Sequence, residues 1–161
     1  MSSSVTQSWQ SPCNLHTLFK RPVIQYCYSK LSTRRNPMAE LTRKDVILIL
    51  GMGGANPRLA GVDLSELELE HFDFHGANLT KANLSKADLS HANLSRANLR
   101  EADLRWAKLS HANLNEADLS GADLSGADLN GADLSQAVLE RTDLGRTILK
   151  GAIMPNGTQH V

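Results

Sequence analysis

Residues 117 to 134 read ADLSGADLSGADLNGADL, so nearly the same five residues occur again and again. Neither an α-helix nor a plain β-strand suits a period of five. Five residues turn a helix about 140° beyond a full circle, which would scatter the leucines over every face. In a strand, an odd period sends successive leucines to opposite faces. The pattern instead favours a chain that turns a corner once per unit, with Ala and Leu inside and Asp outside.

The five-residue period extends far beyond this stretch. Its central large residue recurs at every fifth position from Leu64 to Leu149 and again at Met154. Two positions before the centre, thirteen consecutive units from Ala77 to Ala137 have alanine. Four units predict a square coil of twenty residues, and successive coils would stack as parallel strands about 4.8 Å apart. We therefore expect residues that are twenty apart to share one outward column.

The segment ANLTKANLSKADLSHANLSRANLREADL, residues 77 to 104, resembles the pentapeptide-repeat family, whose consensus is A(D/N)LXX. The resemblance covers residues 62 to 154 and implies a right-handed quadrilateral β-helix. The predicted fold class is an all-β solenoid, a right-handed quadrilateral parallel β-helix with a short N-terminal capping helix. The ending GAIMPNGTQH, residues 151 to 160, is similar to endings common in cyanobacterial members of the family.

The chain is predicted to contain four segments. These are a basic leader at 1–37, a capping helix and loop at 38–58, the pentapeptide-repeat β-helix at 59–156 and a tail at 157–161. The leader has ten Ser/Thr, five Lys/Arg and no Asp/Glu, and its composition predicts disorder. It is either an organellar transit peptide or an extension upstream of a start at Met38 rather than Met1. Both cysteines, Cys13 and Cys27, lie in the leader, so they cannot be a disulfide framework of the repeats.

A short helix is expected at residues 39–50, before the first coil. Glu40 suits the positive N-terminal end of that helix, while Thr42 with Asp45 three positions on would cap a later start. The apolar side chains of residues 46–50 would contact the N-terminal end of the β-helix, where larger interior residues replace alanine. A second interpretation of residues 46–50 is the apolar region of a cleaved signal peptide.

At the C-terminal end, Ile148 and Ile153 occupy outward positions that hold Asp or Asn elsewhere. We expect the tail, residues 155–161, to fold over them. The alternative is an apolar patch through which two copies form a weak homodimer by way of a helix end.

Three histidines, His71, His91 and His111, follow one another at intervals of twenty and should stack at one corner. Neighbouring imidazoles about 4.8 Å apart would be able to ligate Zn²⁺ or Ni²⁺. No carboxylate or thiol completes a tetrahedron, so an exposed corner without a metal is the favoured interpretation.

The remaining candidates belong to an interaction surface. Trp106 should stand on the surface, where it would pack with Arg105 or contact a partner protein. Glu66, Glu68 and Glu70 concentrate negative charge near the N-terminal end. This charge matters because some family members resemble B-DNA in shape and charge and bind DNA gyrase.

Nothing in the repeats predicts an active site or a cofactor. Residues 62–154 hold nine Lys/Arg and fifteen Asp/Glu, which disfavours nucleic-acid binding, and no apolar run approaches the ~18 residues that span a membrane. The predicted function is a non-enzymatic protein-interaction or scaffold module with an unidentified protein partner. The alternative is a DNA-mimic regulator that binds a nucleic-acid enzyme such as DNA gyrase. The predicted location is the cytoplasm, or the chloroplast or thylakoid lumen if the leader is a targeting segment.

Overall fold

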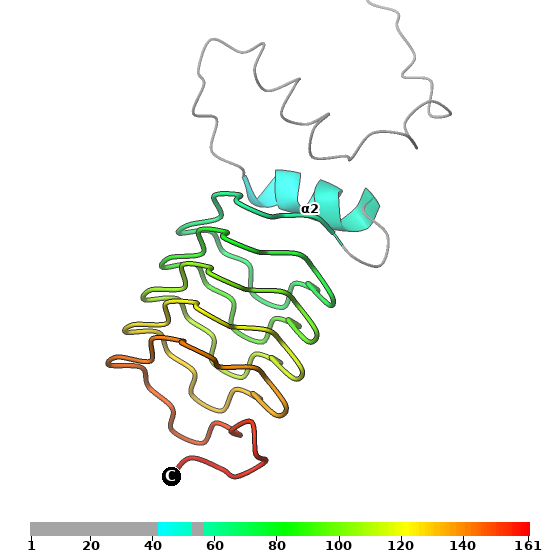
Figure 1. The fold of residues 1–161 in the computed structure, drawn as a ribbon. Helices are drawn as coiled ribbons and strands as arrows, with labels where there is room; N and C mark the ends of the chain where they lie inside the picture. Colours follow the sequence, from blue (N-terminus) through cyan, green and yellow to red (C-terminus); the bar gives the residue numbers. More distant parts are fainter. Residues whose placement is uncertain (1–41, 53–56) are drawn as a thin grey trace, which may run out of the picture.

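The structure is a computed structural model that describes residues 42–52 and 57–161. In these ranges one helix, α2 (Arg43–Met52), precedes a coil that winds around itself toward the C-terminus (Figure 1). The predicted leader at 1–37 and Glu40 lie outside the described residues.

The coil is held together by a ladder of parallel bridges between residues that are twenty apart. The first bridge joins Arg58 to Asn78 and the last of the parallel ones joins Asp133 to Ile153. Each strand is therefore reduced to a single bridged position, the one before the central large residue. The predicted columns are confirmed. A unit centred on Leu59 precedes the one at Leu64, since Leu59 is fully buried and Arg58 is bridged.

Every unit uses its backbone in the same way. The N–H of Leu64 donates to the carbonyl of Asn83 in the next coil at 2.7 Å, and the N–H of Glu66 donates to Ser85 at 3.0 Å. The N–H of Asn83 donates back to the carbonyl of Val62 at 2.9 Å. Each coil thus gives two N–H groups per unit to the coil after it and one to the coil before it. No buried side-chain nitrogen or oxygen within the described residues lacks a hydrogen-bond partner.

The corners between units are tight turns with a left-handed residue. In the turn from Leu79 to Ala82, the N–H of Ala82 donates to the carbonyl of Leu79 at 3.0 Å, and Lys81 at the third position has a φ of 58°. A positive φ at that position is the feature of a type II turn. Thirteen residues other than glycine accept this conformation at equivalent corners, with φ between 55° and 61°.

The Asp or Asn before each centre stabilises the corner that follows it. Asp63 Oδ1 accepts a hydrogen bond from the N–H of Ser65 at 3.0 Å. Asn83 Oδ1 accepts from both the N–H and the hydroxyl of Ser85, at 3.1 and 2.7 Å. This is an Asx turn, in which a short side chain binds the backbone two residues on. It explains why the sequence prefers Asp or Asn before the centre and Ser after it.

The interior is a continuous stack of leucine and alanine. All thirteen alanines from Ala77 to Ala137 are buried, as are the leucine centres from Leu79 to Leu134. At the N-terminal end the larger side chains fill more space, and the rings of Phe72 and Phe74 stack with centroids 6.0 Å apart. The core is therefore packed along its length, as the alternation of one large and one small inward residue predicts.

Helix α2 lies beside the first coil at the N-terminal end of the β-helix (Figure 1). It begins at Arg43 rather than residue 39, because Thr42 and Asp45 form the predicted capping box. The N–H of Thr42 donates to Asp45 Oδ2 at 2.9 Å, and the N–H of Asp45 donates to Thr42 Oγ1 at 3.4 Å. Val46 is fully buried and Leu50 partly buried against the core. The expected contact by Ile47 is wrong, since its side chain is 52% exposed on the outer side of the helix.

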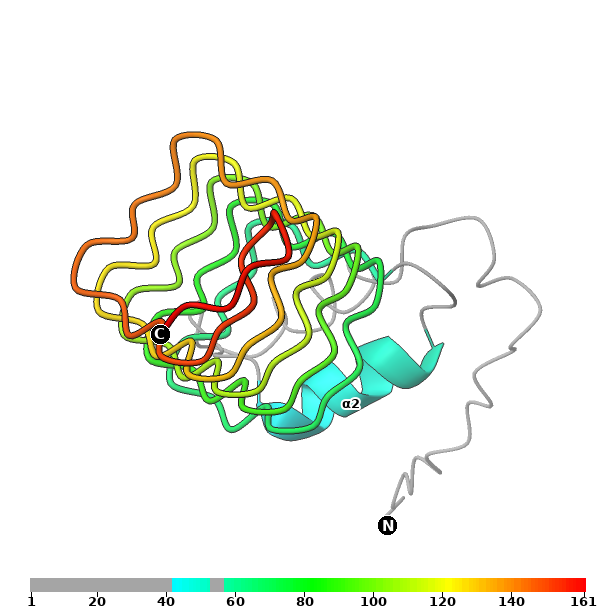
Figure 2. The same ribbon diagram turned by 90° about the horizontal axis from the view of Figure 1, so that it is seen from below.

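The tail folds back across the C-terminal end of the coil (Figure 2). Gln159 forms an antiparallel bridge with Ile153, and the N–H of Gly151 donates to the carbonyl of His160 at 2.7 Å. The expectation that the tail covers Ile153 is therefore confirmed at the level of backbone pairing. For Ile148 it is wrong, because its side chain remains 53% exposed.

Candidate interaction surface

The three predicted histidines stack at one corner of the coil. The ring centroids of His71 and His91 are 5.0 Å apart and those of His91 and His111 are 5.2 Å apart, with interplanar angles of 12° and 10°. Parallel imidazoles direct their nitrogens side by side rather than toward one point. Among residues 42–52 and 57–161, no group of three His, Cys, Asp or Glu side chains is placed to hold a metal ion.

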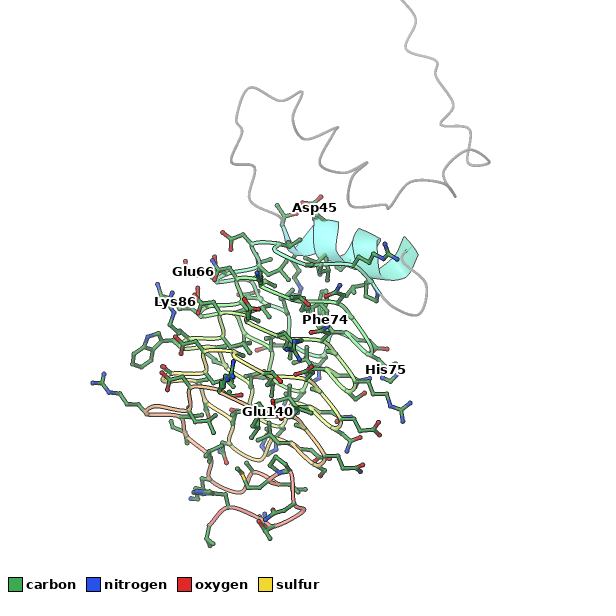
Figure 3. All side chains as sticks on the ribbon, in the orientation of Figure 1. Asp45, Glu66, Phe74, His75, Lys86 and Glu140 are labelled. Atoms are coloured by element: carbon green, nitrogen blue, oxygen red, sulfur yellow. The ribbon has the colours of Figure 1, made fainter. Side chains whose placement is uncertain are left out.

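Trp106 stands on the surface, as predicted, with 57% of its side chain exposed. The indole rests on the next coil, where a Cβ added to Gly126 would lie 2.5 Å from its Cε3 atom. In the coil before, Lys86 occupies the same corner and its Nζ donates to Glu66 Oε1 at 2.8 Å (Figure 3). The column of Glu66, Lys86, Trp106 and Gly126 is therefore present as the sequence predicts.

Arg105 binds carboxylates on its own face of the coil. Its Nη2 and Nε donate to the two oxygens of Asp103 at 2.6 and 2.8 Å, and Nε lies 3.9 Å from Asp123 Oδ2. The hydrogen bond from this guanidinium holds the pKa of Asp103 below its usual range, against the opposing effect of partial burial. The fork geometry fixes the direction of the Arg105 side chain.

The charged side chains of neighbouring coils are mostly tied to one another. Lys108 Nζ donates to Asp88 Oδ2 at 2.9 Å, and Arg96 binds both oxygens of Glu116 at 3.0 and 3.1 Å. Burial raises the pKa of Asp88, but the hydrogen bonds from Ser90 and Lys108 outweigh it and lower the pKa overall. Cross-coil pairing of this kind holds long side chains in defined positions on the surface.

The three glutamates near the N-terminal end are not an uninterrupted negative surface. Glu66 pairs with Lys86, and Glu68 Oε2 lies 3.8 Å from Arg43 Nη1 of helix α2. Glu70, with Glu68, contributes to the raised pKa of Lys108, after the larger effect of Asp88. Cations therefore lie within ion-pair distance of Glu66 and Glu68, two of the three predicted acidic residues.

The ladder, the square coil and the alternating Ala and Leu interior define a β-helix of five-residue units. A sequence profile described as pentapeptide repeats (8 copies) matches residues 58–96, 97–136 and 117–156. The chain belongs to the pentapeptide-repeat family, and its coil is the right-handed quadrilateral β-helix of that family. The earlier start at residue 58 agrees with the first bridge of the ladder.

Several solved structures are similar to this chain. A pentapeptide repeat protein (Rfr23) from the cyanobacterium Cyanothece 51142 is 38% identical, with 54% of this chain and 59% of that chain covered and a TM-score of 0.43. HetL, involved in heterocyst differentiation regulation in the cyanobacterium Nostoc, is 35% identical, with 65% and 62% covered and a TM-score of 0.27. A pentapeptide repeat protein from the Arabidopsis thaliana thylakoid lumen is 32% identical, with 63% and 67% covered and a TM-score of 0.34.

The alignment spans about three fifths of the length of the Cyanothece protein. A comparison with curated protein sequences finds no match. Within residues 42–52 and 57–161, no helix has both the length and the apolar character needed to cross a membrane.

Proposed function

We propose that this chain is a non-enzymatic protein-interaction module, which presents rigid polar faces of its β-helix to a protein partner. The observation that carries the proposal is the fixed outward arrangement of charges. Pairs such as Lys86 with Glu66 and Lys108 with Asp88 join side chains of successive coils over an interior filled by Leu and Ala. Individual exposed pairs contribute little to stability, so their regular placement suits recognition better than folding.

The contact surface that we propose is the Trp106 corner, formed by Lys86, Arg105 and Trp106. A large exposed aromatic side chain beside an orientated arginine is the composition of an interface hot spot. The indole is supported from below by Gly126, and Arg105 is held by Asp103. Both side chains are already held in place. Little of their conformational entropy would therefore be lost when a partner binds.

We also propose that helix α2 caps the N-terminal end of the β-helix, which would otherwise leave an unpaired edge. Support comes from the burial of Val46 and from the contacts of Arg43, whose guanidinium lies 5.5 Å from the Phe72 ring and near Glu68. Val46→Asp should lower the midpoint of urea unfolding clearly, whereas Ile47→Asp, on the exposed side, should leave it nearly unchanged. Equal effects of the two variants would remove the cap proposal.

The location of the protein stays a prediction. It is the cytoplasm, or the chloroplast or thylakoid lumen if the leader is a targeting segment. One similar protein comes from the thylakoid lumen.

Affinity purification from an extract of the source organism tests the interaction function. The wild type should enrich at least one protein in a fixed ratio, and Trp106→Ala should lose it. Ile47→Ala is the matched control, because Ile47 is also exposed, at 52%, but lies on helix α2 and not at the Trp106 corner. No enriched protein, or equal capture by both variants, would overturn the proposal for the Trp106 corner.

The DNA-mimic alternative is tested with purified gyrase. Mimicry needs continuous negative charge, and the pairing of Glu66 and Glu68 with cations weakens it here. Inhibition of supercoiling by the wild type that disappears when Glu66, Glu68 and Glu70 are changed to lysine would establish the alternative instead.

A further inference from the structure

The last coil ends in a strand edge that the tail covers only in part. The tail crosses the end of the coil, and the part of the last coil drawn in orange projects beyond it (Figure 2). The centres Leu139, Leu144 and Leu149 are partly buried, whereas the centres from Leu79 to Leu134 are fully buried. We call residues 137–150 the open end edge.

The open end edge has more hydrogen-bond donors than acceptors. In the coil before, the N–H groups of Leu119, Gly121 and Leu124 donate to carbonyls of the last coil at 2.8 to 2.9 Å. The equivalent N–H groups of the last coil have no acceptor among the described residues, and these belong to Leu139, Arg141, Leu144, Arg146 and Leu149. The carbonyls that would accept from a further coil belong to Ala137, Thr142 and Thr147. The open end edge therefore has five free N–H donors and three free carbonyl acceptors.

The tail demonstrates what kind of segment this end binds. The N–H of Met154 donates to the carbonyl of Thr158 at 2.8 Å, and the N–H of His160 donates to Ala152 at 2.7 Å. Together with the antiparallel bridge between Gln159 and Ile153, these bonds show an extended strand paired on one side of the last coil. The open end edge continues the same backbone pattern on the other sides.

The side chains of the open end edge favour an acidic occupant. The edge contains three cationic side chains and only two carboxylates, those of Glu140 and Asp143. The cations make no ion pair with any residue in the described ranges, and they belong to Arg141, Arg146 and Lys150. The surplus of N–H groups adds partial positive charge at the same edge. The unpaired donors and cations also oppose the association of two such ends, because a second copy would bring donors against donors.

We propose that the open end edge is a β-augmentation site for an extended acidic segment of a partner protein. The segment would lie along the side of the coil centred on Leu144. There its carbonyls would accept from the free N–H groups of Leu144 and Arg146, and its carboxylates would bind Arg141 and Arg146 at the two flanking corners. Ile148, an exposed residue of the edge, would contact an apolar side chain of the added strand. This inference rests on the proposed interaction function and gives the chemistry of one partner segment.

A display library of short linear peptides, panned against the full chain, tests this site. Enriched peptides should lack proline and be rich in Asp and Glu. Their binding should slow hydrogen exchange of the amides of Leu144 and Arg146, as followed by NMR. Affinity should fall by about tenfold or more in the double variant Arg141→Glu, Arg146→Glu, which removes two charge-assisted contacts. Arg58→Glu, at the opposite end, is the matched control and should bind normally.

Several results would overturn the site. Enrichment of basic or neutral peptides, protection of amides elsewhere, or equal binding by the double variant would each exclude an acidic strand on this edge. Protection of the same amides at high protein concentration without peptide would instead assign the edge to a second copy of the chain. No enrichment in the library would also reject the inference. The proposed function has its own test. If the peptide experiments reject this site but a partner whose capture needs Trp106 is purified, the proposed function still stands.

Discussion

The contact between Trp106 and Gly126 makes a sharp test of how one coil supports the next. Gly126 and Gly121 occupy equivalent corners, with φ of 73° and 70°. An alanine at either position takes on a left-handed conformation that costs about 1 kcal/mol. The two positions differ in what lies above them. A Cβ at residue 121 would meet Glu101 Cγ at an ordinary 3.5 Å, whereas a Cβ at residue 126 would meet the Trp106 ring at 2.5 Å.

Gly126→Ala must therefore displace the indole, whereas Gly121→Ala need not move Glu101. If the displaced ring returns roughly 40 Å² of apolar surface to water, the additional cost is about 1 kcal/mol. We expect Gly121→Ala to lower the free energy of unfolding by about 1 kcal/mol and Gly126→Ala by about 2 kcal/mol. Urea unfolding followed by circular dichroism measures both values.

Fluorescence reports the displacement directly. The chain has two tryptophans, so a Trp9→Phe background leaves Trp106 as the emitter. Gly126→Ala should shift its emission to longer wavelength, and Gly121→Ala should not. In a Trp106→Ala background, Gly126→Ala should cost no more than Gly121→Ala, which gives a coupling of about 1 kcal/mol in the double-mutant cycle. Equal costs of the two alanines in the wild-type background would refute the reasoning.

Three further predictions concern the core and the ion pairs. Leu104→Ala, in a fully buried column, should cost about 2–5 kcal/mol, and Leu149→Ala in the partly exposed last coil clearly less, both measured by urea unfolding. Ala102→Leu should overfill the interior and cost about 1–3 kcal/mol. Arg105→Gln should raise the pKa of Asp103, as followed by NMR titration of its carboxylate.

The direction of the Asp103 pKa shift determines how the stability effect of Arg105→Gln depends on pH. The pKa of Asp103 is lowered in the folded protein, so its contribution to stability is full above the unfolded pKa of about 3.9 and is lost as pH falls through the folded value. The stability difference between wild type and Arg105→Gln should therefore shrink on acidification. Lys81→Gln removes the same charge elsewhere and should leave the Asp103 titration unchanged. A difference that grows toward low pH, or equal costs of the two leucine variants, would contradict these expectations.

Most of the architecture follows from the period of the sequence. Because Ala and Leu must both face inward once per five residues, the corner, the coil of four units and the columns of residues twenty apart all come from one constraint. The capping box at Thr42 and Asp45 could also be predicted, since its hydrogen bonds are local. The β-helix is predicted from residue 59, and the first bridge of the ladder is at Arg58.

The surface was less predictable, because exposed side chains choose among several neighbours of similar energy. The indole of Trp106 rests on Gly126 of the next coil, and Arg105 binds two carboxylates on its own face. The five free N–H groups of the last coil depend on where the tail stops pairing, which involves backbone geometry that no residue pattern encodes.

The interval of twenty residues between column neighbours also determines how this molecule tolerates changes in length. Insertion or removal of one five-residue unit would keep the interior intact, because Ala and Leu would still alternate. Everything beyond that point would, however, turn by a quarter revolution, and cross-coil pairs such as Lys108 with Asp88 would be exchanged for new ones. A change of four units would restore every column. Length variants of this chain should therefore fold alike but differ in surface, and only those that differ by whole coils should keep the same face toward a partner.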